Sequence, residues 1–350
     1  MGKFRYDDPA GLIAGSVVLE LLAIFCVGLR FYSRRWKGQH ILTSDWLILI
    51  AFIIGTGMTV VEIYGVKVEA LAYPLGSTIE DPRAVTGRLN KAKHIELSYL
   101  LLGIAAVGLI KLSVTFLYWH LFAQVKFRRL LIVWMVVITA WATSFVLSGL
   151  LECGSHLTAL FGQPQEYLDH CGSAIPSGWA MVGTDIATDL ITLLIPIPVV
   201  LGLQMSTHRK VLTLLIFMIG ALSVAASIVK GYIYITASLG LYTEDAILIL
   251  TGISVWNLIE VQVGIIAACG PTLRSILSHL FAKDGSFTSK LWSSNLKGSG
   301  QSSSFVKMPD SEVRLGTGEG SASKAPSDRS QVSQYELELM NDATKPGNQV

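Results

Sequence analysis

The chain has 350 residues, of which 51% are hydrophobic and only 15% charged, and its formal net charge is +2. This composition is too apolar for an ordinary soluble domain, so part of the solvent around the protein must be lipid. The near-neutral charge gives no indication of a nucleic acid or acidic substrate as partner. The four cysteines are too few for a disulfide scaffold, and no Cys/His group has the spacing of a structural zinc site.

Seven apolar stretches are long enough to cross a bilayer, which takes about 20 helical residues. They leave almost no polar face for water, so they predict an all-α membrane protein, a bundle of seven transmembrane helices. The first run ends in a basic cluster and the second follows at once, so we expect a retained helix and not a cleaved signal peptide. The expected spans are 10–31, 46–64, 98–122, 130–151, 178–203, 211–236 and 247–268.

Basic residues predict the orientation of the bundle. They follow the first, third and fifth expected spans, whereas the connections after the fourth and sixth carry none, so the N terminus is expected outside and the C terminus in the cytosol. The exception is the connection 65–97, in which acids offset the bases and a short interfacial helix is expected. The residues that set the orientation are Arg30, Arg34, Arg35, Lys37, Lys126, Arg128, Arg129, Arg209 and Lys210.

The composition changes after the last span, which divides the chain into a membrane domain at 1–281 and a tail at 282–350. The tail is rich in Ser, Gly and mixed charge, and cannot bury enough apolar surface to offset the entropy of ordering. We expect it to be disordered and cytosolic, with serines that could be phosphorylated and segments that could dock a signalling partner.

Ionisable residues inside the expected spans are the most informative feature. Each costs about 2.5 to 3.5 kcal/mol in hydrocarbon, so each should face the bundle interior and have a partner. Counting 1.5 Å per residue from the outer ends predicts two layers, hence two polar networks. Those nearer the outer ends are Glu62, Asp185 and Lys230; those near the midplane or deeper are Glu20, Lys111, Asp189 and Glu260.

Asp185 and Asp189 are four residues apart, so their side chains point the same way, and Lys230 and Lys111 are the available counter-ions. One interpretation is a set of structural ion pairs that fixes helix packing; the other is a polar pocket that binds a ligand or moves a proton. Pro196 and Pro198 are expected to kink the fifth span and to open a cavity.

Cys153 and Cys171 both lie in the expected outer loop after the fourth span. Oxidising conditions there would allow a disulfide between them, which we expect, although two free thiols fit the sequence as well.

Residues 20–280 resemble the fungal rhodopsin-like family of integral membrane proteins, which includes orphan receptor-like proteins and a member from a satratoxin biosynthetic cluster. The order of the matching residues carries the resemblance, which implies a receptor-like or secondary-metabolism role. The chain departs from the family pattern at Ser44, His120 and Lys230, where an aspartate and two arginines are usual. The matching residues are Arg30, Tyr32, Arg34, Asp45, Trp46, Lys111, Ser113, Tyr118, Cys153, Cys171, Asp189, Pro196, Ile197, Pro198, Gly220, Trp256, Glu260, Cys269 and Pro271.

The last expected span contains no lysine, and a retinal protein needs one there for its Schiff base. We therefore expect a protein without retinal or another cofactor.

Three functions fit the sequence. The first is a receptor or sensor that binds a small, largely apolar molecule between its helices. The second is a membrane-embedded enzyme, or an auxiliary of one, in fungal secondary metabolism, with Asp185, Asp189 and Glu20 as acid or base in an isomerisation or cyclisation. A transporter is third. The expected membrane is the plasma membrane or the endoplasmic reticulum.

Overall fold

The computed structural model describes residues 6–74, 82–121, 124–154, 171, 174–198, 207–241 and 245–283. These residues form seven helices and belong to one compact unit, Met1–Leu291. The predicted all-helical class is confirmed, while residues 284–350 of the predicted tail lie outside the described residues. The helices are α1 (Pro9–Trp36), α2 (Thr43–Lys67), α3 (Pro82–Leu121), α4 (Val125–Leu150), α7 (Ala174–Leu194), α9 (Thr207–Ser238) and α10 (Ala246–Lys283).

Six of these helices are long and apolar enough to cross a membrane, so the chain is a multi-pass membrane protein by the composition of its helices. The exception is α7, which has 21 residues and carries Asp185 and Asp189. Composition alone therefore identifies α7 as a span least clearly.

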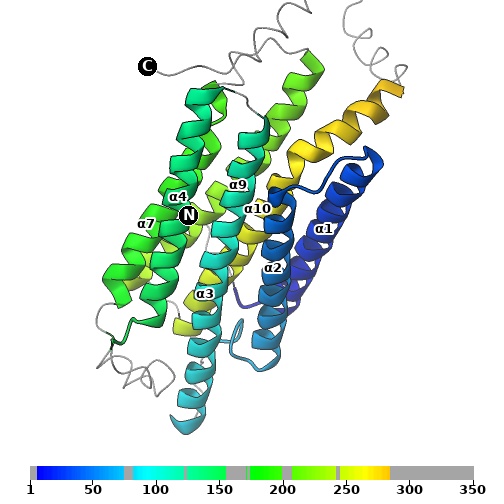
Figure 1. Cartoon of the computed structure of the whole chain (residues 1–350). Helices are drawn as coiled ribbons and strands as arrows, with labels where there is room; N and C mark the ends of the chain where they lie inside the picture. The colour runs from blue at the N-terminus through cyan, green and yellow to red at the C-terminus, as the bar shows by residue number, and fades with distance from the viewer. Residues whose placement is uncertain are drawn as a thin grey trace, which may run out of the picture. The chain divides into compact units, whose positions relative to one another are not determined.

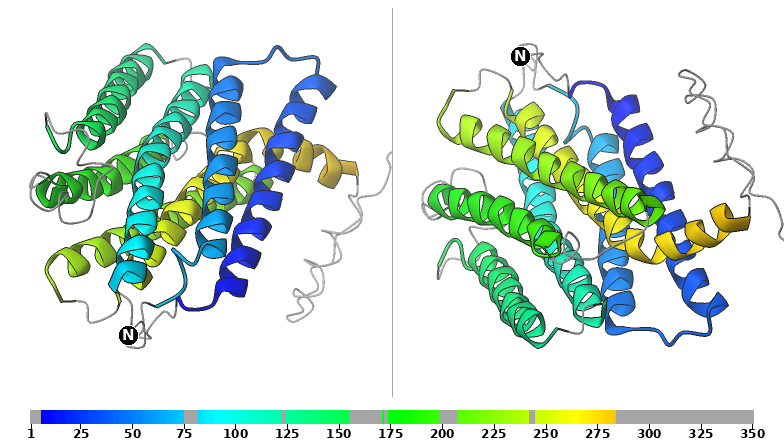
Figure 2. Two further views of the ribbon diagram at one scale, coloured as in Figure 1. Left: turned by 90° about the horizontal axis from the view of Figure 1, so that it is seen from below. Right: turned by 90° about the horizontal axis from the view of Figure 1, so that it is seen from above.

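The helices lie in two rows, with α1, α2, α3 and α4 side by side in chain order and α10, α9 and α7 packed across them (Figures 1 and 2). Helix α10 is central, because it packs against α9, α1, α3 and α2. Helix α4 packs along α3 but meets α7 only sparsely. Consecutive helices run in opposite directions, so the start of α1, the end of α4 and the start of α10 lie at one end of the bundle (Figure 1).

Helix α3 is much longer than the sequence predicted. It begins at Pro82 and has 40 residues, about 60 Å at 1.5 Å per residue, which is roughly twice the thickness of a hydrocarbon core. The predicted loop over 65–97 with a separate interfacial helix is therefore wrong, because residues 82–97 are the first turns of α3. Hydropathy missed them because they are polar and project beyond the apolar part of the span.

The fifth span is interrupted at the prolines for which the sequence predicts a kink. Helix α7 ends at Leu194, Ile195 and Pro196 form a turn, and helical backbone resumes at Ile197 and Pro198. Proline has no N–H to donate and its ring clashes with the preceding turn, which explains why the helix stops there. Residues 199–206 lie outside the described residues.

Apolar side chains face outwards and polar ones inwards. Phe25, Ile53, Val136 and Leu222 are each about 60% exposed, whereas most of the ionisable residues inside the spans are buried. This is the arrangement expected of a bundle surrounded by lipid, because only a non-polar solvent leaves the outer apolar surface without penalty.

Cys153 and Cys171 form a disulfide that packs against Leu97 of α3. Because the bond closes a loop over a sequence separation of 18, Cys153→Ser should lower the free energy of unfolding by roughly 3 kcal/mol. The measurement is thermal unfolding in detergent with and without reductant. Reductant should lower the midpoint of the wild type towards that of the variant and leave the variant unchanged; equal midpoints for all four samples would contradict the cross-link.

Candidate functional site

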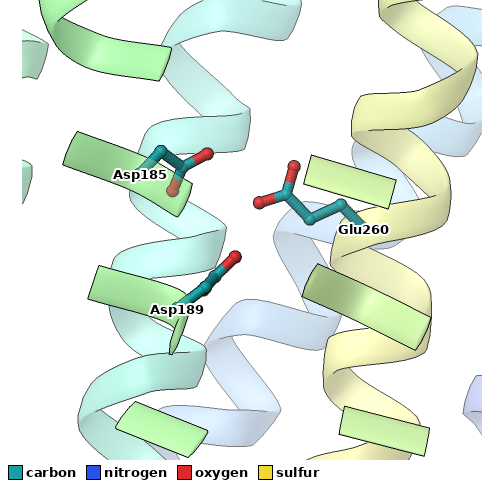
Figure 3. Close-up of side chains that lie close together, drawn as sticks. All are labelled: Asp185, Asp189 and Glu260. Carbon is teal, nitrogen blue, oxygen red and sulfur yellow. The ribbon is translucent and has the colours of Figure 1, made fainter. Parts of the chain in front are cut away.

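Five ionisable side chains from four helices meet in the interior of the bundle and form what we call the ion cluster. Lys111 comes from α3, Asp185 and Asp189 from α7, Lys230 from α9 and Glu260 from α10. Figure 3 shows the carboxylates of Asp185 and Asp189 pointing from α7 towards that of Glu260, and oxygen atoms of the three lie within 4.8 Å of one another. All but Asp189, which is partly buried, are buried.

Two ammonium groups hold the three carboxylates together. Lys111 Nζ lies 2.9 Å from Asp185 Oδ1 and 3.0 Å from Asp189 Oδ1. Lys230 Nζ lies 2.9 Å from Asp185 Oδ2 and 2.5 Å from Glu260 Oε2. Asp185 therefore bridges the two lysines, and removing either lysine would leave a carboxylate without its ion-pair partner in a water-poor interior.

Neutral groups complete the shell around the ion cluster. Lys111 Nζ also donates to Thr188 Oγ1 at 2.7 Å and lies 4.6 Å from the centre of the Trp141 ring. Ser227 donates to Asp189 Oδ2 at 2.8 Å. Helices α7 and α9 approach closely beside the cluster, because a Cβ atom on Gly231 would lie only 2.7 Å from Val182 Cγ1. A larger residue than glycine there would push Lys230 away from Asp185.

Glu260 is the one cluster member with an unsatisfied atom. Its side chain is 2% exposed, and its Oε1 has no hydrogen-bond partner among the described residues. A buried carboxylate oxygen without a donor is costly.

Two other predicted residues lie apart from the ion cluster. Glu20 on α1 is held by neutral donors: Thr56 and Thr59 at 2.7 and 3.0 Å and Gln262 Nε2 at 2.6 Å. Glu62 on α2 accepts a hydrogen bond of 2.5 Å from Tyr99 of α3. Both carboxylates link helices, so the structure separates Glu20 from Asp185 and Asp189, with which the enzyme hypothesis had grouped it.

The two predicted layers do not match the observed grouping. Lys111, Asp189 and Glu260, placed deeper by counting residues, join Asp185 and Lys230 in one network, while Glu62 forms a separate one. Counting depth from span ends fails because the helices differ in where they start, and α3 begins sixteen residues before the predicted position.

A buried ion pair near the C-terminal end of α1 was not predicted from the sequence. Arg30, counted from the sequence among the basic residues after the first span, is fully buried, and its Nε lies 2.7 Å from Asp45 Oδ1 on α2. It also donates to Ala268 O of α10 at 2.7 Å and to Ser44 Oγ at 3.1 Å. The spacing of four between Arg30 and Arg34, with Asp45 in the first turn of the next helix, was the available signal.

A second missed residue is Glu96, which the sequence placed in a loop. It lies on α3 and accepts a hydrogen bond of 3.0 Å from Ser254 of α10. The sequence did not predict its position inside the bundle, because it lies in the polar first turns of α3 that hydropathy did not assign to a helix.

Three cavities lie along the same helices as the ion cluster. The mouth cavity, about 280 Å³, is lined by Lys93, Glu96, Leu97, Leu100, Phe145, Ser148, Gly149, Glu152, Ser177, Gly178, Met181, Tyr234 and Leu250. The inner cavity, about 60 Å³, shares Glu96, Leu100, Met181 and Tyr234 with it and reaches Asp185 and Lys230. The Pro271 cavity, about 100 Å³, is lined by Lys111, Asp189, Tyr118, Gly220 and Pro271 among others.

Comparison with known proteins places this architecture in a family. The family described as the fungal rhodopsin domain matches residues 29–279. The chain is 26% identical over 275 residues to "Polyenoic acids biosynthesis gene cluster protein Ba17b" of Metarhizium anisopliae, covering 75% of this chain and 72% of that protein. It is 25% identical over 317 residues to "Receptor GIN3" of Arthrobotrys oligospora, covering 85% and 71%. No solved structure matches the chain.

Proposed function

The chain belongs to the fungal rhodopsin domain family, and on that premise we propose that it is a receptor-like membrane protein that binds a small, largely apolar molecule without retinal. The observation that carries this proposal is the mouth cavity, which continues through the inner cavity to the ion cluster. The name of the relative "Receptor GIN3" agrees with it.

The lining of the mouth cavity suits an apolar molecule with one polar end. Leu97, Phe145 and Leu250 offer apolar surface for its body. The polar end would reach Asp185 and Lys230, which line the inner cavity. A molecule seated there would alter the contacts that hold α7 to α9, and a ligand shifts a conformational equilibrium only through such differential contacts.

The proposed orientation places the mouth cavity outside the cell or in the lumen. The disulfide lies at that end, and disulfides persist in oxidising compartments. Arg34, Arg35, Arg128 and Arg129 lie at the other end, which suits a cytosolic face that contacts a signalling partner and is continued by the Ser/Gly-rich tail. The membrane itself is proposed as the plasma membrane or the endoplasmic reticulum.

Filling the mouth cavity tests the proposal. Ser148 lines the cavity, so Ser148→Trp should block it, whereas Leu147→Trp on the outward face of the same helix should not. The measurement is thermal unfolding in detergent with a panel of lipophilic compounds that includes polyene carboxylic acids and their methyl esters. A compound at about 100 times its Kd should stabilise the wild type by about 2.7 kcal/mol.

Comparing the two variants shows whether a compound binds in the mouth cavity. The stabilisation should be retained in Leu147→Trp and absent in Ser148→Trp, while both variants keep the unliganded midpoint close to that of the wild type. A compound that stabilises all three proteins equally binds elsewhere and contradicts the proposed site.

The second candidate is an enzyme or auxiliary protein in a fungal biosynthetic pathway. It is supported by the name of the relative in a polyenoic acids cluster and by the two aspartates and Glu260 gathered in an apolar interior, where a carboxyl group could serve as acid or base. Deleting the gene and profiling metabolites separates the two: an accumulating intermediate favours the enzyme, and unchanged metabolites with an altered response to external compounds favour the receptor.

A further inference from the structure

The inner cavity and the Pro271 cavity follow each other along the same four helices. On α3 the lining passes from Val107 in the inner cavity to Ile110 in the Pro271 cavity. On α9 it passes from Lys230 to Val224. The two cavities thus form successive parts of one path through the bundle, interrupted between them.

The ion cluster lies at this interruption. Asp185 and Lys230 line the inner cavity, whereas Lys111 and Asp189 line the Pro271 cavity. Asp185 and Asp189 are one helical turn apart, and Lys111 contacts both. Groups reached from opposite ends of the bundle are therefore joined by a single ammonium group.

The charges of the ion cluster do not balance. Three carboxylates face two ammonium groups, so the fully ionised cluster has a formal charge of −1. An uncompensated charge in a water-poor interior is costly. The unpartnered Oε1 of Glu260 is the atom on which one added positive charge would remove both the excess charge and the unsatisfied lone pair.

A proton fits this place better than a metal ion. Both ammonium groups already contact the carboxylates, and Lys230 Nζ lies 2.5 Å from Glu260 Oε2 and 2.9 Å from Asp185 Oδ2. A metal ion that used these carboxylates would lie close to two positive charges and would have to displace them. A proton needs no such space.

We propose that the ion cluster binds one exchangeable proton, carried by Glu260, and is the closed midpoint of a proton pathway between the inner cavity and the Pro271 cavity. A proton from water in the inner cavity binds Asp185, passes to Glu260 Oε1 and then to Asp189, and leaves to water in the Pro271 cavity, because Asp185 lines the first cavity, Asp189 lines the second and Glu260 lies beside both. Only O–H bonds form and break, and the cluster returns to its starting charge.

Lys230 contacts Glu260, and Asp185 and Asp189 of α7 and Lys111 of α3 belong to the same ion cluster. The helices packed against α10 also carry Glu20 on α1, Glu62 on α2 and Glu96 on α3, which lie outside the ion cluster. Glu20 is held by neutral donors outside the ion cluster, so it serves as the matched control for Glu260.

Proton flux measures the pathway directly. The full chain is reconstituted into liposomes that contain a pH-sensitive dye, and a potassium diffusion potential with valinomycin drives proton uptake. We expect the wild type and Glu20→Gln to acidify the lumen faster than protein-free liposomes, and Glu260→Gln to fall to the protein-free rate. Flux that persists in Glu260→Gln, or no flux with the wild type, would overturn the pathway.

Infrared spectroscopy tests for the bound proton, and its first measurement uses the wild-type protein, so it does not depend on the folding of a variant. A C=O stretching band of a protonated carboxyl should be present at neutral pH and should shift on transfer to D₂O. One component of it should vanish in Glu260→Gln and survive in Glu20→Gln and Glu62→Gln. Absence of that component, or thermal stabilisation of the wild type by sodium chloride but not by choline chloride, would overturn the assignment to a proton. This inference does not depend on the ligand proposed above, because neither measurement uses it.

Discussion

Replacing Lys230 by alanine is expected to lower the free energy of unfolding by about 3 to 5 kcal/mol, the usual cost of stranding a buried charge. Lys230 is in contact with two carboxylates, Asp185 at 2.9 Å and Glu260 at 2.5 Å, and all three side chains are buried. In the variant Lys111 is the single ammonium group left for both Asp185 and Asp189, so one carboxylate of the ion cluster loses its counter-ion. Thermal or denaturant unfolding in detergent, together with the yield of folded protein, gives the measurement.

A double variant separates charge from volume. Lys230→Met with Asp185→Asn keeps much of the side-chain volume and removes both charges of one ion pair, while Lys111 stays paired with Asp189, so it should recover a large part of the stability lost in Lys230→Ala. Replacing a buried ion pair by well-packed uncharged groups is often close to neutral. If Lys230→Ala were as stable as the wild type, the ion pairs of Lys230 with Asp185 and Glu260 would not contribute to the stability of the fold.

Replacing Arg30 by alanine is expected to lower the free energy of unfolding by a similar amount, about 3 to 5 kcal/mol, because Asp45 would keep its charge in a fully buried position. Arg30 also joins three helices, since it bonds to Asp45 and Ser44 of α2 and to Ala268 O of α10. The partial substitute is Arg34, whose Nε lies 3.2 Å from Asp45 Oδ2. The measurement is again unfolding in detergent.

Arg35 provides the control for Arg30, because it lies on the last turn of the same helix and is exposed. Arg35→Ala should change the free energy of unfolding by less than about 0.5 kcal/mol, as surface substitutions usually do. Equal effects of the two substitutions would mean that the Arg30 to Asp45 pair adds nothing to the stability of the fold.

Composition and periodicity were enough to predict seven helices, because a helix in lipid must be apolar along most of its length. The same rule identified Lys111, Asp185, Asp189, Lys230 and Glu260, since each is conspicuous in such a sequence. It also predicted that Lys230 would pair with Asp185, as the structure shows.

The grouping of the charges could not be predicted, because it depends on helix rotation and stagger, which packing decides. Glu96 and the first turns of α3 were missed since they extend beyond the apolar part of the span. Arg30 was missed because a basic residue at a helix end is ordinarily solvated, and only the position of Ala268 O on a distant helix shows that it is enclosed.

The sparse packing between α4 and α7 bears on the route by which a ligand enters the bundle. The mouth cavity is lined by Phe145 and Ser148 of α4 and by Met181 of α7. A lipophilic compound dissolved in the surrounding leaflet could therefore enter the cavity laterally, between these two helices, without first returning to water. Its apparent potency would then follow its concentration in lipid. Analogues that partition more strongly into membranes would show a higher apparent affinity even where their contacts with the protein are identical.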